Sequence, residues 1–396
     1  MIPVTEARKI IRENMFSLPP VEVDVEKAVD HVLAEDVYAT CDIPPFHQSA
    51  MDGYAFVFKD WKNGGSLLVD GEIPAGKGSK APISTGKAVR IFTGAVVPEG
   101  ADTVVMQERV TRKGTQLFIE DELLEEGRNI RYKGTEIRKD DLALPEGTVL
   151  SPAGVGFLSG VGIARVKVYP MPYVAIVVTG NELQQAGKEL QPGQIYESNA
   201  SMLRAALKQI GIEKISVHLA EDKLDTLTGI LGNALKNNDV VLLTGGVSVG
   251  DYDFVVRAAE NCGVQQLFHK LKQRPGKPLY MGRKENKLVF GLPGNPSSVL
   301  TCFYEYVWNA LQALCGRERQ LTSLNVPLSI AYAKKNALTH FLKGIYKNGE
   351  VTPATGQESF RLGSFARANC LIELGEEVKE YEKGEEVTIH LLPLYG

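Results

Sequence analysis

The sequence predicts a multi-domain chain that combines an α/β domain, built on a mostly parallel sheet, with smaller β modules. Residues 171–317 alternate apolar runs that end in glycine with stretches of helical spacing, which is typical of a parallel sheet with helices on its faces. Residues 45–140 and 318–396 instead contain short β-rich runs separated by turn residues, as in small all-β modules. The chain has 396 residues, which at roughly 150 residues per domain leaves room for several domains.

The N-terminal part is predicted to be helical and discontinuous in sequence. Residues 1–44 predict a helix, a break at a proline pair and a second helix over VEKAVDHVLAED, where apolar residues recur at helical spacing. Another helix is expected near residue 152, because Ser151 is a favoured N-cap and Pro152 suits the first helical position. Residues 141–170 contain little apolar material for a core of their own. We therefore expect them to fold onto residues 1–44, leaving 45–140 as an insertion.

Individual elements follow from the same patterns. In the inserted module, strands are predicted at SLLVDGEI, AVRIFTGAVV, DTVVMQERV and QLFIED. In the α/β part, strands are predicted at YVAIVVTG, DVVLLTGG and KLVFGLPG, and helices at SNASMLRAALKQIG, DTLTGILGNALKN, YDFVVRAAENCG and SSVLTCFYEYVWNALQALCG. After a charged linker, GRERQLTS, the C-terminal β domain is predicted to use VPLSIAYAKK, HFLKGIYKNG, ANCLIELGEE and EEVTIHLLPL.

Composition excludes several classes of protein. The net charge of -4 lacks the basic excess of a general nucleic-acid-binding protein. No apolar run approaches the ~20 residues of a membrane span, and the N-terminus lacks the apolar core of a signal peptide, so we expect a cytoplasmic protein without membrane contact. The five cysteines are odd in number and include no C-x-x-C pair, which argues against a disulfide framework or a structural zinc site.

Three loops that follow predicted strands carry the chemistry. Ligands of open α/β sheets bind beyond the carboxyl ends of the strands, where glycine allows close backbone approach and helix N-termini supply N–H donors. One such loop is typical of any strand-to-helix turn, but three on one sheet edge favour a phosphate-bearing ligand. The loops are TGNEL with Gly180 and Glu182; TGGVSVGDYDF with Gly245, Gly246, Ser248, Asp251 and Asp253; and GLPGNPSS with Gly294, Asn295 and Ser298.

Charged residues near these loops suggest a metal site and an anion site. Glu182 and Asp253 follow glycine turns and, with Asp222, offer the oxygen ligands that Mg²⁺ uses beside substrate phosphates. Arg274 and Lys277 flank a Pro-Gly turn, which favours a rigid oxyanion clamp. The alternatives are ordinary ones: Asp251 and Asn295 as helix caps, and the basic pair as solvated surface charge.

The stretch DIPPFHQSAMDGYAF in the inserted module does not reveal its role from residue types alone. The Asp52-Gly53 dipeptide between apolar flanks is compatible with a simple hairpin. His47, as a lone histidine, is more typical of a hydrogen-bonded structural side chain than of a catalyst.

Taken together, these motifs resemble a known family. PPFHQSAMDGYAF, FTGAVVPEGADTVVMQE, GRNIRYKGTEI, TGNEL, TGGVSVGDYDF, RPGKPL and GLPGNPSSV occur here in the order seen in molybdopterin molybdenumtransferases, the family of MoeA and the gephyrin E domain. The resemblance runs from about residue 2 to the end. It implies a discontinuous helical part (1–44 with 141–170), an inserted β module (45–140), a doubly wound molybdopterin-binding α/β domain (171–317) and a C-terminal β-barrel-like domain (318–396).

The resemblance also implies an activity, a transferase reaction of molybdenum cofactor biosynthesis. Members insert molybdate into adenylylated molybdopterin, with Mg²⁺-dependent hydrolysis that releases AMP and molybdenum cofactor. They are homodimers whose active site is shared between subunits, and an upstream molybdopterin adenylyltransferase is the expected partner. Matching motifs by position implies the following sets: catalytic, Asp52, Glu136, Glu182, Asp253 and Lys277; substrate-binding, Gly180, Gly245, Gly246, Ser248, Arg274, Gly294, Asn295, Ser298, Ser359 and Arg361; metal-binding, Glu182, Asp222 and Asp253.

Three positions depart from the family pattern. Glu136 stands where many members have aspartate, which lengthens the side chain and keeps its charge. Arg274 stands where others have lysine, and it prefers bidentate geometry. Leu338 stands where members often have arginine, with Lys343 nearby, so the usual cation of the C-terminal domain is in question.

Other functions fit parts of the pattern. A peptide-binding scaffold is the reading from a different class, because the gephyrin branch uses this fold to bind a receptor peptide; against it, this chain retains nearly the whole acidic set and lacks the N-terminal domain and linker of such scaffolds. An adenylyltransferase resembles residues 171–317 but lacks the SAMDG module found here. A variant tuned to tungstate is not separable from one tuned to molybdate.

Overall fold

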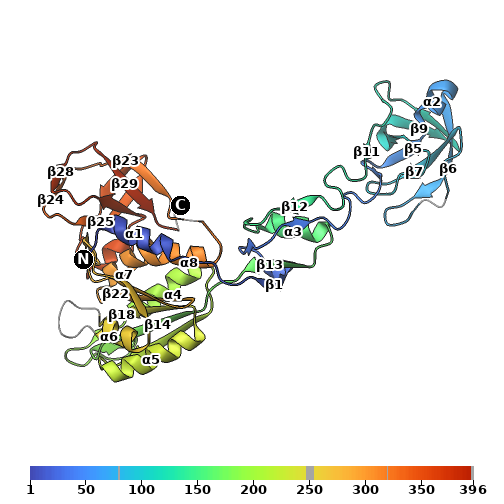
Figure 1. Cartoon of the computed structure of the whole chain (residues 1–396). Helices are drawn as coiled ribbons and strands as arrows, with labels where there is room; N and C mark the ends of the chain where they lie inside the picture. The colour runs from blue at the N-terminus through green and yellow to red at the C-terminus, as the bar shows by residue number, and fades with distance from the viewer. Residues whose placement is uncertain (79–80, 247–253, 319, 394–396) are drawn as a thin grey trace. The chain divides into compact units, whose positions relative to one another are not determined.

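The computed structural model of the chain (Figure 1) describes residues 1–78, 81–246, 254–318 and 320–393. Its elements form two compact units. The larger unit comprises Met1–Val21, Asp30–Val32 and Tyr169–Gly396, and the smaller unit comprises Glu22–Val29 and Leu33–Val168. The first 21 residues therefore belong to the larger unit, whereas the prediction grouped them with residues 141–170. The reason is that helix α1 (Val4–Glu13) buries Val4, Ala7 and Ile11 in the core of the larger unit.

A six-stranded sheet forms the centre of the larger unit. Its order is β17 (Ile215–Ala220), β14 (Val174–Thr179), β18 (Val240–Thr244), β22 (Lys287–Leu292), β21 (Tyr280–Lys284) and β19 (Gln265–His269). The first four strands are mutually parallel, and β21 runs antiparallel to both of its neighbours. The predicted mostly parallel sheet is confirmed. Strands β17, β19 and β21 were not predicted; in β17 the exposed edge position leaves only Ala220 fully buried, which weakens the apolar signal.

Helices cover both faces of this sheet. Along β14, Ala175 and Val177 pack with α5 (Leu224–Asn237) and α6 (Phe254–Asn261), while Val174, Ile176 and Val178 pack in the other cluster with α4 (Asn199–Gln209). This alternation follows from the two-residue period of a strand. Because both faces are covered, every residue of β14 and β18 is buried. The remaining helical segment runs without a break through α7 (Pro296–Cys302), a π-helical turn (Phe303–Val307) and α8 (Trp308–Leu314).

The C-terminal segment forms a sheet, as its β-rich runs predict, with one unexpected strand. Its order is β20 (Gln273–Arg274), β25 (Thr339–Lys347), β27 (Cys370–Leu374), β29 (Glu386–Leu391) and β23 (Ser323–Pro327), with β26 (Glu350–Pro353) paired to β25. Two further strands, β24 (Tyr332–Lys334) and β28 (Lys379–Tyr381), pair separately, and α9 (Leu362–Phe365) is short. Strand β20 comes from the α/β part of the sequence, yet it pairs in parallel with β25.

The smaller unit contains the inserted β module. Its sheet has the order β8 (Thr103–Met106), β5 (Gly53–Phe56), β7 (Lys87–Ile91), β6 (Ser66–Ile73), β10 (Gln116–Ile119) and β9 (Val110–Lys113). The four predicted strands of the module are therefore present. Helix α2 (Phe58–Gly64), which has no fully buried residue, was not predicted. Two short pairs add to the smaller unit: β11 (Ile130–Arg131) with β4 (Gln48–Ser49) in the module, and β12 (Leu142–Leu144) with β3 (Val37–Tyr38) in the segments that flank it.

The second predicted helix of residues 1–44 is wrong. The segment forms β1 (Val21–Asp24), a 3-10 turn (Val25–Lys27) and β2 (Val32–Leu33), and Asp30 has a φ of 63°, a left-handed conformation that ends any helix there. Its apolar side chains still share one core with those of residues 137–168. Helix α3 (Pro152–Gly160) is confirmed, with the Ser151 hydroxyl accepting a hydrogen bond from the Gly154 backbone N–H at 3.1 Å.

Candidate active site

The loops that follow β14, β18 and β22 lie against one another at the carboxyl edge of the large sheet. Gly245 has a φ of 82°, and a Cβ atom at this position would lie 2.4 Å from the Thr179 carbonyl oxygen. A Cβ atom at Gly294 would lie 3.9 Å from the Gly245 Cα. Glycine at 245 is therefore required both by the left-handed backbone and by the contact with β14. The structure thus brings together three predicted substrate-binding glycines, Gly245, Gly246 and Gly294.

An acidic pair lies beside the first of these loops. The exposed Glu182 folds back over Gly180, since a Cβ atom on Gly180 would lie 3.0 Å from Glu182 Oε1. The Asp222 backbone N–H donates to Asn181 Oδ1 at 3.4 Å, which brings the loops after β14 and β17 together. Within the described ranges, Asp222 Oδ1 is buried and has no hydrogen-bond partner. A buried carboxylate oxygen without a donor is costly unless a cation or another donor reaches it, so Asp222 can accept a cation such as Mg²⁺.

Three predicted residues of the second loop cannot be placed. Ser248, Asp251 and Asp253 lie outside the described residues. The predicted third metal ligand and the predicted helix cap are therefore left as expectations.

A buried glutamine fixes the turn that carries the predicted basic pair. Arg274 and Lys277 are exposed, and no ion pair is formed by either within residues 1–78, 81–246, 254–318 and 320–393. Beneath them, the side-chain amide of Gln273 donates to the Pro275 and Gly276 carbonyls, at 3.1 Å each, and the Tyr306 hydroxyl donates to Gln273 Oε1. Sequence reasoning missed Gln273 and Tyr306, because a glutamine before a turn and a tyrosine in a helix carry no signal by themselves.

The turn also contacts the start of α7. A Cβ atom on Gly276, whose φ is 86°, would lie 2.4 Å from Cys302 Sγ and 3.7 Å from the Ser298 carbonyl oxygen. Ser298 is only 3% exposed, so the backbone at this predicted anion-binding residue packs against the turn. The basic turn and the β22–α7 loop therefore form one continuous surface.

Residues 356–361 complete this surface from the C-terminal part of the chain. Asn295 Nδ2 donates to Ser359 Oγ at 2.8 Å, and the Ser297 backbone N–H donates to the Ser359 carbonyl at 3.1 Å. Arg361 is exposed and forms an ion pair with Glu358 at 3.0 Å, so its charge is partly balanced. The structure thus brings Ser359 beside Asn295, as the substrate-binding set requires.

Lys343, which lies near the position of the missing family arginine, is a structural residue. It is 2% exposed, and its Nζ donates to the carbonyls of Gly356, Glu358 and Arg361 at 2.8, 3.4 and 3.1 Å. Burial lowers its pKa from the ordinary value. Lys343 therefore holds the loop of Ser359 in place from below and does not supply the missing exposed cation.

Asp52 lies in the smaller unit in a rigid turn. Its Oδ1 accepts hydrogen bonds from the Thr93 backbone N–H at 2.8 Å and from the Thr93 hydroxyl at 2.7 Å, and these bonds lower the pKa of Asp52. Gly53 is required next to it, because a Cβ atom there would lie 1.8 Å from the Val105 carbonyl oxygen. Strands β4 and β5 on either side do not pair with each other, so the turn is not a hairpin.

Glu136 is exposed in the same unit, and its backbone N–H donates to the Ile43 carbonyl at 2.9 Å. Nearby, His47 Nδ1 accepts a hydrogen bond from the Lys133 backbone N–H at 3.0 Å. The histidine therefore has the structural role that sequence reasoning favoured.

A second charged cluster lies in the larger unit, away from the strand-end loops. Arg8 pairs with Glu305 at 2.7 Å and with Glu373 at 2.9 Å, and His390 contacts the same two carboxylates at 2.8 and 3.4 Å. We call these four residues the Arg8 cluster. Glu305, Glu373 and His390 have a spacing that a metal ion could use, but the Arg8 guanidinium already provides their positive partner, so the cluster is structural.

Charge within the Arg8 cluster shifts its titrations. Burial alone would raise the pKa of Glu305, but the charges and hydrogen bonds of His390 and Arg8 outweigh it and hold the pKa below the ordinary value. Burial alone would lower the pKa of His390, but Glu305 and Glu373 raise it overall.

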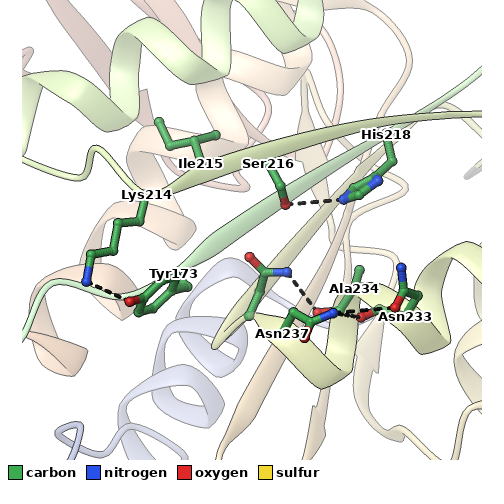
Figure 2. Close-up of a pocket in the computed structure, with 9 residues that line it drawn as sticks. Tyr173, Lys214, Ile215, Ser216, His218, Asn233, Ala234 and Asn237 are labelled. Carbon is green, nitrogen blue, oxygen red and sulfur yellow. Dashed lines mark hydrogen bonds between the residues drawn. The ribbon is translucent and has the colours of Figure 1, made fainter.

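A pocket of about 390 Å³ lies at the amino ends of β14 and β17 (Figure 2), and not at the strand-end loops. In it, Lys214 Nζ donates to the Tyr173 hydroxyl at 2.7 Å, and His218 contacts Ser216 at 3.2 Å. Three asparagines from the end of α5, Asn233, Asn237 and Asn238, complete the lining. The polar groups of this pocket are largely engaged with one another.

Comparison with known proteins gives the family. The model of the MoeA N-terminal region matches residues 2–162, that of the probable molybdopterin-binding domain matches residues 175–313, and that of the MoeA C-terminal region matches residues 325–392. The chain belongs to the MoeA family. This confirms the resemblance inferred from the motifs, and with it membership in an enzyme family.

Relatives of the MoeA family match along the whole chain. A Staphylococcus aureus protein named molybdopterin molybdenumtransferase is 34% identical over 98% of this chain and 95% of its own, and the Haemophilus influenzae protein of the same name is 34% identical over 99% and 100%. Two crystal structures of the MoeA protein from Pyrococcus horikoshii are 32% and 30% identical, with TM-scores of 0.85 and 0.80; each covers 99% of this chain, and the chain covers 99% and 100% of them. The predicted fold class is confirmed. No helix in the described ranges has the length and apolar character needed to cross a bilayer.

Proposed function

We propose that the protein is a molybdenum insertase of molybdenum cofactor biosynthesis. It transfers molybdate to adenylylated molybdopterin, and hydrolysis of the pyrophosphate link releases AMP and molybdenum cofactor. The observation that carries the proposal is the continuous surface at the strand ends. There, the glycine loops after β18 and β22 contact each other and the end of β14, and the turn with two exposed cations packs against α7, which follows β22. The loop after β17, which Asn181 contacts, adds the buried Asp222 oxygen that has no hydrogen-bond partner in the described ranges.

We assign anion binding to two elements: the turn that carries Arg274 and Lys277, and the pair formed by Asn295 at the start of α7 and Ser359. Arg274 and Lys277 attract and orient molybdate, since both cations project from a turn that is fixed from within. Asn295 and Ser359 are already hydrogen-bonded to each other. This bond fixes the orientation of the Asn295 amide and the Ser359 hydroxyl, so that their remaining N–H and O–H donors point in defined directions for a substrate oxygen. In the transfer, two molybdenum–sulfur bonds form, and one oxide oxygen leaves as water with the two thiol protons. Molybdenum keeps its oxidation state.

Phosphate chemistry is assigned to the loops after β14 and β18. Glycines 245 and 246 allow the backbone to approach the pyrophosphate link closely. Glu182, Asp222 and, by family position, Asp253 hold Mg²⁺, which when bound neutralises charge on the phosphate oxygens. A water oxygen bonds to phosphorus, the pyrophosphate P–O bond breaks, and AMP leaves.

The decisive experiment measures AMP release from adenylylated molybdopterin and Mg²⁺, with and without molybdate. We expect release that depends on both molybdate and Mg²⁺, and loss of release in Asp253→Asn and Lys277→Ala variants that fold normally. Absence of AMP release with molybdate or tungstate would contradict the proposal. A tighter response to tungstate would change only the oxyanion that is assigned.

We also propose that the protein is a cytoplasmic homodimer whose active site is shared between subunits. A molybdopterin adenylyltransferase supplies its substrate, adenylylated molybdopterin. If Asp52 of one subunit acts with Lys277 of the other, mixed dimers of the inactive Asp52→Asn and Lys277→Ala variants contain one intact site and one doubly altered site. Unfolding and refolding the two variants together should therefore restore AMP release, whereas each variant treated alone stays inactive. No recovery in dimers shown to be mixed would contradict the shared site.

A further inference from the structure

We propose that Gln273 and Tyr306 are positioning residues, a buried pair that fixes the Arg274–Lys277 turn for oxyanion binding. This inference rests on the proposed function, because it names what holds the anion-binding turn. It concerns residues that touch the turn and not the substrate.

The side-chain amide of Gln273 is buried and fully hydrogen-bonded. Its side chain is 1% exposed, and Nε2 donates to the carbonyls of Pro275 and Gly276, at 3.1 Å each. Its Oε1 accepts the Tyr306 hydroxyl. A buried primary amide has two donor hydrogens and one acceptor oxygen to satisfy, and here two of its bonds go to the two residues that separate Arg274 from Lys277. The amide therefore determines the path of the chain between the two cations.

Tyr306 provides the hydrogen-bond partner of the Gln273 oxygen, and its hydroxyl also lies within electrostatic range of the Arg8 cluster. It is fully buried, and the Gln273 contact is the hydrogen bond formed by its hydroxyl in the described structure. Tyr306 lies in the π-helical turn Phe303–Val307, a distortion that is frequent at functional sites. One helical residue thus orients the amide, and the amide orients the turn.

The turn between Arg274 and Lys277 is tightly packed against its neighbours. A Cβ atom on Gly276 would lie 2.4 Å from Cys302 Sγ and 2.8 Å from Gln273 Nε2. The Thr339 backbone N–H donates to the Lys272 carbonyl at 2.9 Å, and β20 pairs with β25 on the other side. The turn is therefore held by contacts with α7, with Gln273 and, through β20, with β25. A fixed turn loses less conformational entropy when it binds an anion than a mobile one does.

The test uses Gln273→Met, which preserves length and removes the donors and the acceptor, and Tyr306→Phe, which removes only the hydroxyl. Molybdate binding to the full-length protein is measured by calorimetry, and the KM for molybdate and kcat by AMP release. We expect Gln273→Met to weaken molybdate binding about tenfold and Tyr306→Phe about threefold, each loss being well under 2 kcal/mol at about 1.4 kcal/mol per tenfold. The KM for molybdate should rise while that for adenylylated molybdopterin stays unchanged.

Two features separate positioning from a general structural role. Because the Tyr306 hydroxyl reaches the turn through its hydrogen bond to Gln273, the double variant should bind molybdate no more weakly than Gln273→Met alone. Tyr304→Phe is the matched control: it removes a hydroxyl from the same π-helical turn, but that hydroxyl contacts Gln209 at 3.2 Å and not the basic turn. We expect this control to bind molybdate like the wild type.

The outcomes distinguish this inference from the proposed function. If the wild type releases no AMP with either oxyanion, the proposed function fails. If the wild type is active but Lys277→Ala retains molybdate binding, the turn is not the anion site and the inference fails while the proposed function stands. If Lys277→Ala loses binding while Gln273→Met and Tyr306→Phe bind like the wild type, only the positioning pair is refuted. Hydrogen exchange of residues 272–280 provides a readout without oxyanion, and faster exchange in Tyr306→Phe than in Tyr304→Phe is expected. Equal exchange in these two variants would overturn the inference even if Gln273→Met failed to fold.

Discussion

Replacing Arg8 with methionine should destabilise the larger unit strongly, because Arg8 is the permanent cation of the Arg8 cluster. Its guanidinium bonds Glu305 at 2.7 Å and Glu373 at 2.9 and 3.1 Å, and the Glu305 side chain is only 2% exposed. Breaking a buried ion pair costs about 3–5 kcal/mol. Since the Arg8 side chain is 27% exposed and His390 remains as a partner, we expect a loss of about 2–4 kcal/mol.

The pH dependence of this loss follows from the two shifted pKa values. The pKa of His390 is raised from 6.5, so its contribution to stability is complete below that pH and is lost as pH rises through the folded-state value. The pKa of Glu305 is lowered from 4.5, so its contribution is complete above that pH and is lost as pH falls through the folded-state value. The wild-type Arg8 cluster should therefore contribute most to the free energy of unfolding between pH 4.5 and pH 6.5, the ordinary pKa values of Glu305 and His390. In Arg8→Met, neutral His390 leaves two carboxylates without a cation, so the loss should be larger at pH 9 than at pH 5.5.

Thermal unfolding of the full chain at both pH values tests this reasoning. At about 2–4 °C per kcal/mol for a unit of this size, the unfolding transition of the larger unit should fall by about 5–15 °C. Lys9→Met is the matched control, because Lys9 is the next residue of α1, is 72% exposed and pairs only loosely with Glu13 at 3.8 Å. Its effect should stay within about 0.5 kcal/mol. A loss below about 1 kcal/mol in Arg8→Met, or an equal loss at both pH values, would refute the argument.

Three further predictions concern the site loops. Lys343→Met should remove one of the donors to each of three carbonyls of residues 356–361 and loosen this loop, so molybdate affinity should fall about tenfold in calorimetry; unchanged affinity would show that this loop does not bind molybdate. Gly53→Ala should destabilise the smaller unit by about 2 kcal/mol or more, because the new Cβ would overlap the Val105 carbonyl, and denaturant unfolding checks this. Thr93→Val should remove one of the hydrogen bonds that lower the pKa of Asp52, so the pKa should rise in an NMR titration; an unshifted titration would assign the effect to the backbone N–H alone.

The large sheet could be predicted because its central strands are buried on both faces. Strands β14, β18 and β22 consist mainly of apolar residues. A glycine shortly after each strand marks its carboxyl end in the sequence. The edge strand β17 has Ser216 and His218 between its apolar residues and lies half in solvent, so its pattern is weak. The predicted helix over residues 25–36 failed because Val25, Ala28 and Leu33, placed at helical spacing, pack from a 3-10 turn and a strand into the core of the smaller unit.

Some residues of the candidate site could likewise be predicted from the sequence, and others could not. Glycines, carboxylates and cations at strand ends could be recognised because their chemistry is local in sequence. Gln273, Tyr306 and Lys343 could not, since their roles arise from contacts across 33 residues for the first pair and with a loop 13 to 18 residues away for the third. A buried lysine that donates to three carbonyls looks, in sequence, like any surface lysine.

The pairing of β20 with β25 has a consequence for dissecting the protein. A fragment cut at the linker near residue 318 would leave Gln273–Arg274 without its neighbouring strand and would expose the backbone edge at Thr339 and His340 in the complementary piece. Unpaired strand edges promote association with other chains. The C-terminal sheet is thus not a detachable module, and expressing the α/β part alone should yield a protein that aggregates and has lost the geometry of its basic turn.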